Sequence, residues 1–280
     1  MKRIIIQGIE GCFHDAAARQ VFPDAELEVV ECETFPLMVE KIKEDPSLTG
    51  IMAIENTIAG SLLQNHELIH QNNLRITGEY KMRISHVLAA LPGEKIEEIT
   101  EVNSHPIALM QCEEFLLAHP RMKMIEKFDT AGSAREISEE RLKGHAAICG
   151  ELAATLYGLE ILKKGIETNK RNFTRFLIIS HPDNCKDGAL PYGADKSSIV
   201  FTLPHSKGAL SKVLTILAFY DLNLTKIQSF PIIGREWEYK FYIDLTFDDH
   251  ARYRQALEAA RPLTSEFKIL GEYQSCKKII

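Results

Sequence analysis

The spacing of apolar residues constrains the fold of this chain more than any other feature. From residue 1 to about 180, short apolar runs typical of β-strands alternate with segments of helical periodicity. The run RIIIQ is followed by the helical HDAAARQV, for example, and GIMAIE and TRFLIIS are further strand candidates. This alternation predicts an α/β domain with mostly parallel sheets.

The pattern changes at residues 181–195, where proline, glycine, aspartate and asparagine cluster without apolar periodicity. Such a composition is typical of a linker. The rest of the chain predicts the order strand, helix, strand, strand, helix, strand in about eighty residues, which is a ferredoxin-like unit. This unit is too small to be the catalytic domain and large enough to be a sensor. We therefore expect two domains, divided near residue 190.

Composition narrows the class of partner. A net charge of −6, with 26% charged residues, leaves no basic face for a phosphate backbone, so we expect no nucleic-acid partner. No apolar run approaches the roughly 20 residues of a membrane helix, so we expect no membrane partner. The six cysteines include no C-x-x-C pair, and the chain begins on a strand pattern without a leader. These features predict reduced thiols in a cytoplasmic protein with a small-molecule ligand.

His66, Glu67 and His70 form the sequence H-E-x-x-H, which on a helix is the signature of zinc peptidases. A zinc peptidase also needs a third ligand, and neither H-x-x-G-x-x-H nor a suitably placed glutamate follows. Three fixed positions within five residues give weak support. We therefore interpret both histidines as helix residues without a metal.

Small and polar residues gather where predicted strands lead into helices. Such junctions occur at Gly8 and Gly11, after Glu55, at Ser104 as the expected N-cap of a helix over residues 106–118, and at Asp129. In an open α/β sheet, ligands lie beyond the carboxyl ends of strands, where helix N-termini favour anions. Each junction alone is an ordinary cap or turn, but four together favour a cleft that binds carboxylates. A dinucleotide is disfavoured, because GIEG lacks a third glycine and no Walker lysine is present.

Five segments carry a resemblance to a known family. AIENTIAGS, VNSHPIALMQCEEFL, DTAGSA, AAICGELAATLYGL and NFTRFLII look like the successive motifs of prephenate dehydratase, in the same order. The later segments GALSKVL and NLTKIQSFP resemble the ACT regulatory domain that follows in that family. The resemblance implies conversion of prephenate to phenylpyruvate, water and carbon dioxide in phenylalanine biosynthesis, without a cofactor or a metal.

The resemblance also implies an architecture and an assembly. The catalytic domain, residues 1–181, would consist of two α/β lobes like a periplasmic binding protein, with the active site in the cleft. The implied ranges are lobe one at 1–78 and 160–181, lobe two at 79–159, a linker at 182–195 and a ferredoxin-like βαββαβ ACT domain at 196–280. Because ACT domains usually pair, we expect a homodimer or homotetramer with L-phenylalanine as effector.

The motifs imply four catalytic residues: Thr174, Asn56, Gln111 and Glu55. Thr174 would donate a hydrogen bond to the leaving hydroxyl, since its own hydroxyl is too weak an acid to release a proton at neutral pH. Asn56 and Gln111 carry neutral amides that donate without desolvating a charge. Burial at the end of an apolar strand could raise the pKa of Glu55 and make it the proton donor; alternatively it holds N–H groups of the loop.

Other motif residues are implied as a substrate-binding rim. Arg175 is the natural partner of a substrate carboxylate, with an ion pair inside its lobe as the alternative. The rest of the rim is Ser104, Gly60, Ser61, Thr130, Ala131, Gly132, Ser133 and Phe176. The implied contacts to L-phenylalanine are Gly208, Ala209, Leu210, Asn223, Leu224, Gln228 and Ser229.

Two motifs depart from the family pattern. The first motif usually reads G-P-x-G-T-F-S, but here GIEGCFH has Ile9, Cys12 and His14 at the proline, threonine and serine positions. The usual E-S-R-P of the ACT domain is QSFP, with Gln228 for glutamate and Phe230 for arginine. Substrate contacts through the two hydroxyls, and the strength and sign of the effector response, therefore do not carry over.

Two other functions stay open. One is arogenate dehydratase, whose substrate carries an amino group in place of the keto group. The other is a non-catalytic protein that binds small carboxylates, because the two-lobed fold also serves solute binding and transcriptional sensing. The lack of a leader disfavours a secreted receptor, and the lack of a helix-turn-helix segment disfavours a regulator.

Overall fold

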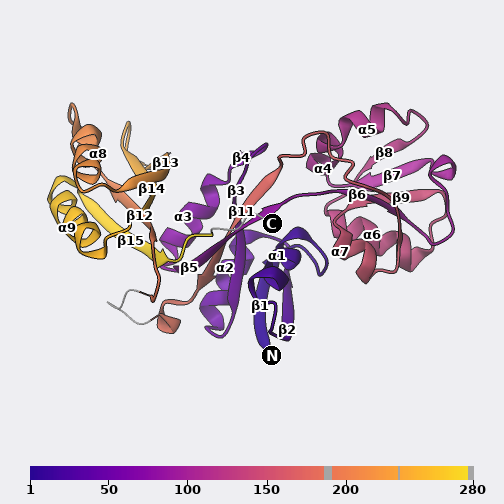
Figure 1. Cartoon of the computed structure of the whole chain (residues 1–280), viewed down its shortest axis with the longest axis horizontal. Helices are drawn as coiled ribbons and strands as arrows, with labels where there is room; N and C mark the ends of the chain where they lie inside the picture. Colours follow the sequence, from indigo (N-terminus) through magenta and orange to yellow (C-terminus); the bar gives the residue numbers. More distant parts are fainter. Residues whose placement is uncertain (186–190, 233, 277–280) are drawn as a thin grey trace.

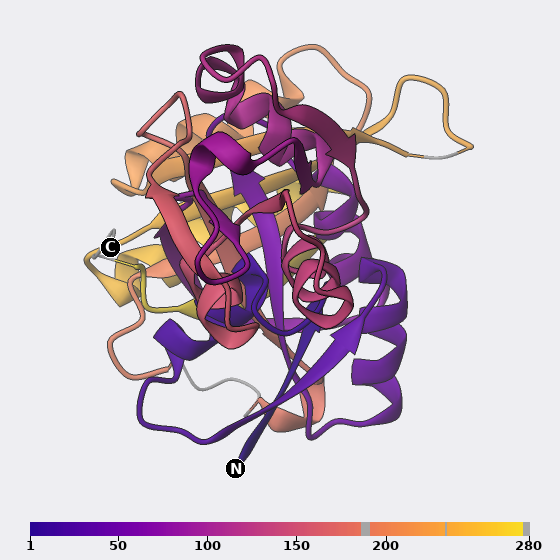
Figure 2. The same ribbon diagram turned by 90° about the vertical axis from the view of Figure 1, so that its right-hand side faces the viewer.

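The computed structural model describes residues 1–185, 191–232 and 234–276, and its strands form three sheets. Figure 1 shows these sheets side by side along the long axis, with the first in the middle, the second at the right and the third at the left. In Figure 2 the molecule is seen from the side of the second sheet, which lies in front of the other two. The chain has the predicted α/β fold. The prediction of mostly parallel sheets is wrong, because the first two sheets each combine parallel with antiparallel strand pairs. Among the described helices, none is both long and apolar enough to cross a bilayer.

The first sheet carries one wall of the site. Its order is β2-β1-β3-β11-β5, and the short β4 pairs with β3. β1 is parallel to β2 and β3, whereas β11 is antiparallel to β3 and β5. The strands are β1 (Lys2–Gln7), β2 (Leu27–Cys32), β3 (Thr49–Asn56), β4 (Gly60–Ser61), β5 (Arg75–Arg83) and β11 (Phe173–Ser180), and the helices are α1 (Phe13–Val21), α2 (Phe35–Glu44) and α3 (Leu63–Gln71).

The second sheet carries the opposite wall, with the order β10-β6-β9-β7-β8. Its strands are β6 (Val87–Ala90), β7 (Glu101–Ser104), β8 (Lys123–Glu126), β9 (His145–Cys149) and β10 (Glu160–Lys164). The helices are α4 (Pro106–Gln111), α5 (Glu113–Leu117), α6 (Thr130–Glu140) and α7 (Glu151–Leu156), with a 3-10 turn at Ile96–Glu98. The first sheet with its helices is called lobe one below, and the second is called lobe two.

The strand pairing differs from the expected lobe ranges in two places. β5 stays in the first sheet as far as Arg83, and β10 pairs with β6 in the second sheet. The chain therefore crosses between the lobes at residues 84–86 and 165–172. Sequence patterns did not indicate β5, β6 and β10, because β5 and β10 interleave charged with apolar residues and β6 is only four residues long.

The third sheet has the order β13-β14-β12-β15, with every neighbouring pair antiparallel. The element order βαββαβ confirms the predicted ferredoxin-like unit. Its elements are β12 (Lys196–Thr202), α8 (Ala209–Phe219), β13 (Asn223–Pro231), β14 (Tyr239–Thr246), α9 (His250–Ala260) and β15 (Glu266–Tyr273), with 3-10 turns at Pro182–Asn184 before it and Arg261–Leu263 within it. We call this part the C-terminal unit.

The C-terminal unit packs directly on lobe one. Val200, Tyr242 and Tyr273 share one buried apolar cluster with Leu177 and Ile179 of β11. Close approach requires glycine at position 271, because a Cβ there would lie 2.0 Å from the Ile76 carbonyl oxygen. The face of the first sheet that turns away from lobe two is therefore covered by α2, α3 and the third sheet together.

Candidate functional site

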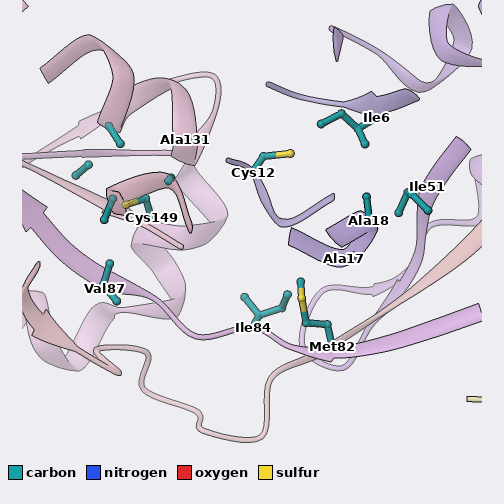
Figure 3. Close-up of a cluster of buried hydrophobic side chains, with 14 of the residues drawn as sticks. Ile6, Cys12, Ala17, Ala18, Ile51, Met82, Ile84, Val87, Ala131 and Cys149 are labelled. Carbon is teal, nitrogen blue, oxygen red and sulfur yellow. The ribbon is translucent and has the colours of Figure 1, made fainter. Parts of the chain in front are cut away.

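A cavity of about 390 Å³ lies between the lobes, and we call it the interlobe pocket. Lobe one contributes β1, the start of α1, β3 and β11, and lobe two contributes α4 and the start of α6. Figure 3 shows the apolar packing beside it, where Cys12 and Ile84 lie between Ile51 of lobe one and Cys149 of lobe two. The volume is in the usual range for pockets that enclose a small molecule.

Asn56 and Thr174 form the centre of the lobe-one wall. They face each other across the antiparallel pair of β3 and β11. The Oδ1 atom of Asn56 accepts hydrogen bonds from the backbone N–H of Ile58 at 2.9 Å and Ala59 at 2.8 Å. A backbone N–H can only donate, so this contact fixes which end of the amide carries the oxygen.

The other end of the Asn56 amide points at Thr174. Its Nδ2 donates to Thr174 Oγ1 at 2.9 Å and to Asn172 Oδ1 at 2.8 Å. Both amide hydrogens are thus engaged by neighbouring side chains, so Asn56 lines the pocket but does not act as the amide donor that was expected there. Because the Thr174 oxygen accepts this bond, its hydroxyl hydrogen is not used on Asn56 and can be donated to a ligand in the pocket that Thr174 lines.

Gln111 lines the pocket from the end of α4 in lobe two. Its Oε1 lies 2.9 Å from Nε2 of His86, which lies in the first crossing segment. His86 was not predicted, because an isolated histidine after a strand matches no motif. The three side chains Asn56, Thr174 and Gln111 therefore do line one cavity, as expected from the motifs.

The pocket is poor in charge. None of the described residues that line it is lysine or arginine. Burial lowers the pKa of His14 to about 4 and also lowers the pKa of His86. Burial raises the pKa of the Cys12 thiol to about 12. At neutral pH these three groups are uncharged, so each of them meets an anion in the pocket as a neutral group.

Asp129 is the one carboxyl group among the described lining residues. It is the N-cap of α6, and its Oδ1 accepts from the Gly132 N–H at 2.8 Å. Burial raises its pKa, although hydrogen bonds from Gly132 and Ala131 oppose that shift. The sequence showed Asp129 only as a helix start, since aspartate is a common N-cap wherever a helix begins.

Glu55 and Arg175 do not line the pocket, which corrects their expected placement. Side chains alternate along a strand, so these neighbours of Asn56 and Thr174 project from the other face of the sheet. The Glu55 side chain is 43% exposed and pairs with Lys226 of β13 at 3.3 Å. The burial on which its expected acid role depends is therefore absent.

Arg175 lies in a buried group of charges beneath the C-terminal unit. Its Nε donates to Glu79 of β5 at 2.6 Å, and its Nη1 donates to Asp244 of β14. Burial alone would lower the arginine pKa, but Asp244, Tyr273 and Glu79 raise it well above its ordinary value. Arg175 therefore forms the ion pair within its lobe that was the alternative prediction, with Glu79. It forms a second ion pair across the interface, with Asp244 of the C-terminal unit.

The remaining rim residues divide into two groups. Thr130 and Phe176 line the pocket as expected. Six others do not line it, namely Ser104, Gly60, Ser61, Ala131, Gly132 and Ser133. Ser104 ends β7 and donates to the Ile148 carbonyl at 2.6 Å, so it does not cap the following helix. His105 is that cap, and the helix expected over residues 106–118 is divided into α4 and α5 at Cys112.

The residues expected to contact L-phenylalanine lie in two elements of the C-terminal unit. Gly208, with φ of +75°, is the N-cap of α8, followed by Ala209 and Leu210. Asn223, Leu224, Gln228 and Ser229 lie on β13, which pairs only with β14 among the described strands. Their role stays a prediction.

The H-E-x-x-H sequence lies on α3, against the C-terminal unit. The His66 ring packs on Tyr242, with centroids 5.3 Å apart, and Glu67 accepts hydrogen bonds from Tyr242 and Lys240. Within the described residues, no three histidine, cysteine, aspartate or glutamate side chains are grouped to hold a metal. These positions are used for packing between lobe one and β14.

Comparison with known proteins gives a consistent result. The family model described as prephenate dehydratase matches residues 4–184. Arogenate dehydratase/prephenate dehydratase 6 of Arabidopsis thaliana is 33% identical over 287 residues, covering 97% of this chain and 68% of the relative. Arogenate dehydratase 5 of the same plant is 35% identical over 289 residues, covering 97% of this chain and 67% of the relative.

Solved structures share the fold of nearly the whole chain. Prephenate dehydratase from Arthrobacter aurescens, in complex with L-Phe, superposes with a TM-score of 0.85 at 30% identity, covering 97% of this chain and 89% of that one. GqqA, described as a novel type of quorum quenching acylase, has a TM-score of 0.87 at 29% identity, covering 98% of both chains. From the family match and these relatives, the chain belongs to the prephenate dehydratase family and is a lyase of the prephenate/arogenate dehydratase type.

Proposed function

We propose that this enzyme converts prephenate to phenylpyruvate, with Thr174 as the hydrogen-bond donor at the leaving hydroxyl. The observation that carries the proposal is the Asn56–Thr174 pair. The Asn56 amide donates to the Thr174 oxygen, so the threonine hydroxyl can donate its hydrogen to a ligand in the pocket. The family match supports the reaction type, and a pocket with no lysine or arginine among its described lining residues suits a substrate that loses a carboxylate as carbon dioxide.

In this reaction the ring C–O bond breaks and hydroxide leaves with its electron pair. The C–C bond to the ring carboxylate also breaks, and its electrons complete the aromatic ring while carbon dioxide departs. One proton is needed to convert the departing hydroxide to water. A hydrogen bond that strengthens as charge develops on the leaving oxygen lowers the barrier. A pocket without lysine or arginine stabilises the carboxylate less than water does, which favours its loss.

We assign the proton donor role to Asp129 in place of Glu55. Asp129 lines the pocket, and burial raises its pKa, so it holds a proton at a higher pH than an exposed carboxyl does. An Asp129→Asn enzyme that keeps the wild-type kcat and the wild-type pH profile would remove this assignment.

The second candidate substrate is arogenate, because the curated relatives are named as arogenate dehydratases or as enzymes of both types. The test is to incubate the protein separately with prephenate and arogenate and to follow phenylpyruvate and phenylalanine. We expect a higher kcat/KM with prephenate. A higher value with arogenate would reassign the substrate, and turnover of neither would overturn the proposed function.

We also propose that residues 1–181 are the catalytic domain and that residues 196–280 form an ACT domain that binds L-phenylalanine. The ferredoxin-like order and the L-Phe complex of the Arthrobacter aurescens enzyme support this assignment. One edge of β13 has no partner among the described strands, which supports pairing of two copies as a homodimer or homotetramer. Trp237, which is 73% exposed, reports on this unit by fluorescence. Unchanged fluorescence and activity on adding L-phenylalanine would contradict the regulatory role.

A further inference from the structure

We infer that His86 is a positioning residue that holds the Gln111 amide with its NH₂ group facing the interlobe pocket. His86 Nε2 and Gln111 Oε1 lie 2.9 Å apart, within hydrogen-bond distance. His86 is 2% exposed and Gln111 is 8% exposed, so water does not compete freely for this contact. Nothing in the resemblance to the family assigned His86 a role.

The surroundings of His86 hold its ring in place from both lobes. Phe13, at the start of α1 in lobe one, packs edge-on against the ring with centroids 5.3 Å apart. The backbone N–H of His86 donates to Glu167 of the second crossing segment at 2.9 Å, and Gln111 closes the other side from lobe two. Since the backbone and the ring are both held, the position of Nε2 is defined before a ligand enters.

The protonation state follows from which atoms have partners. The Nδ1 atom of His86 is buried and has no hydrogen-bond partner among the described residues. If Nδ1 carried the hydrogen, a buried N–H donor would be left unsatisfied, which is rarer and more costly than an unsatisfied acceptor. The ring therefore carries its hydrogen on Nε2 and donates it to Gln111 Oε1. Burial lowers the pKa of His86, which keeps this neutral form at physiological pH.

A fixed oxygen makes Gln111 a donor to the substrate. With Oε1 held by His86, the Nε2 group of Gln111 is left with no hydrogen-bond partner among the described residues. Carboxylate and hydroxyl oxygens of the substrate accept hydrogen bonds, and none of the described lining residues is lysine or arginine. An amide turned the other way would present its carbonyl oxygen to an anion and repel it. His86 thereby sets the polarity of this wall of the pocket.

The test rests on the proposed function and compares three variants. His86→Phe keeps a ring of similar size and removes the donor, and we expect kcat/KM to fall about 10- to 100-fold. His86→Gln places an N–H donor near the same point, and we expect it to recover most of that loss. His119→Phe is the matched control, because His119 lies beyond α5 and does not line the pocket; we expect it to match the wild type.

A double-mutant cycle separates positioning from a general structural role. If His86 acts through Gln111, then Gln111→Leu combined with His86→Phe loses no more kcat/KM than Gln111→Leu alone. Additive losses, or a folded His86→Phe enzyme with kcat/KM within about twofold of the wild type, would overturn the inference.

A second readout does not depend on turnover. In ¹⁵N spectra of the wild type with labelled histidine, we expect the His86 ring to be protonated at Nε2 and not at Nδ1 near pH 7. Protonation at Nδ1 instead would contradict the inference whether or not the dehydratase activity is found. Absence of turnover with both substrates, together with the expected spectrum, would overturn the proposed function and leave the His86 contact in place.

Discussion

The two faces of the paired strands β3 and β11 are chemically opposite. On one face Asn56 and Thr174 line a pocket in which none of the described lining residues is lysine or arginine. On the other face Arg175 lies among buried charges, and Glu55 pairs with a lysine of the C-terminal unit. The four residues form two consecutive cross-strand pairs between β3 and β11. Asn56 lies opposite Thr174, and Glu55 lies opposite Arg175.

The difference shows how one short motif serves two sites. Because side chains alternate along a strand, the sequence TR places threonine in the pocket and arginine beneath the third sheet. The charged side chains Arg175 and Glu55 lie outside the pocket, where they form ion pairs between lobe one and the C-terminal unit. A movement of that unit would therefore act on the strands that carry Asn56 and Thr174.

The largest effect is expected from Arg175→Met, which tests the charged face. The substitution leaves Glu79 and Asp244 buried with less compensation, and we expect the free energy of unfolding to fall by about 3–5 kcal/mol. Urea unfolding followed by circular dichroism measures it. Arg3→Met removes two more exposed ion pairs, to Glu28 and Asp45, and should lower the free energy of unfolding much less. Equal losses of unfolding free energy in the two variants would show that the buried ion pairs contribute no more to stability than the exposed ones.

Thr174→Val tests the pocket face with a side chain of the same shape. Loss of the hydroxyl should lower kcat by about 10²- to 10³-fold, because one donor to a developing negative charge is removed. Stability should change by no more than about 1 kcal/mol, since one hydrogen bond from Asn56 is lost. Thr57→Val, one residue beyond β3 and outside the pocket lining, should keep the wild-type kcat. A Thr174→Val enzyme with near-normal kcat would remove Thr174 from the mechanism.

Lys226→Met tests whether the two faces communicate. Lys226 contacts Glu55 at 3.3 Å and Ser61 Oγ at 2.8 Å, at the ends of the loop that includes the pocket residue Ala59. We expect the L-phenylalanine concentration for half-maximal response to shift about fivefold or more, with kcat in its absence within about twofold. Steady-state kinetics with titrated effector measures both. Lys143→Met, an exposed lysine of lobe two, is the control. An unchanged L-phenylalanine response in Lys226→Met would show that this contact does not couple the C-terminal unit to the pocket.

The smallest effect concerns pH and one buried histidine on each face. Burial lowers the pKa of His14 beside the pocket to about 4 and of His66 beneath the C-terminal unit to about 3. The unfolded chain binds these protons from about pH 6.5 downward, so stability falls as the pH falls through that range. We expect about 1 kcal/mol per histidine per pH unit below 6.5.

Urea midpoints at pH 7.5 and pH 5.5 measure this dependence. His66→Phe keeps the packing on Tyr242 and should flatten the slope, whereas His205→Gln, at an exposed position, should leave the slope unchanged. A slope that is identical in the wild type and His66→Phe would show that His66 is not held neutral by burial.

Much of the fold could be predicted because its signals are local. The apolar runs at β1, β3 and β11 and the βαββαβ order of the C-terminal unit follow from periodicity within short windows. The resemblance placed Asn56, Gln111 and Thr174 in one site, and they line one pocket. Sequence patterns missed β5 and β10 because charged residues interrupt their apolar pattern. Each of these strands pairs with a strand from a distant part of the chain, and that pairing leaves no signal in the local sequence.

Tertiary packing decided the rest of the site. The local sequence does not indicate which face of β3 and β11 packs against the third sheet. The placement of Glu55 and Arg175 at that interface could therefore not be predicted. Nor could it bring His86 to Gln111 or direct the Asn56 amide at Thr174, because these contacts join residues from different elements. Periodicity along the chain indicated most of the elements, and the five motif segments carried the family resemblance. The register and packing between elements determined which of two adjacent side chains faces the substrate, because a strand offers both faces equally until one is covered.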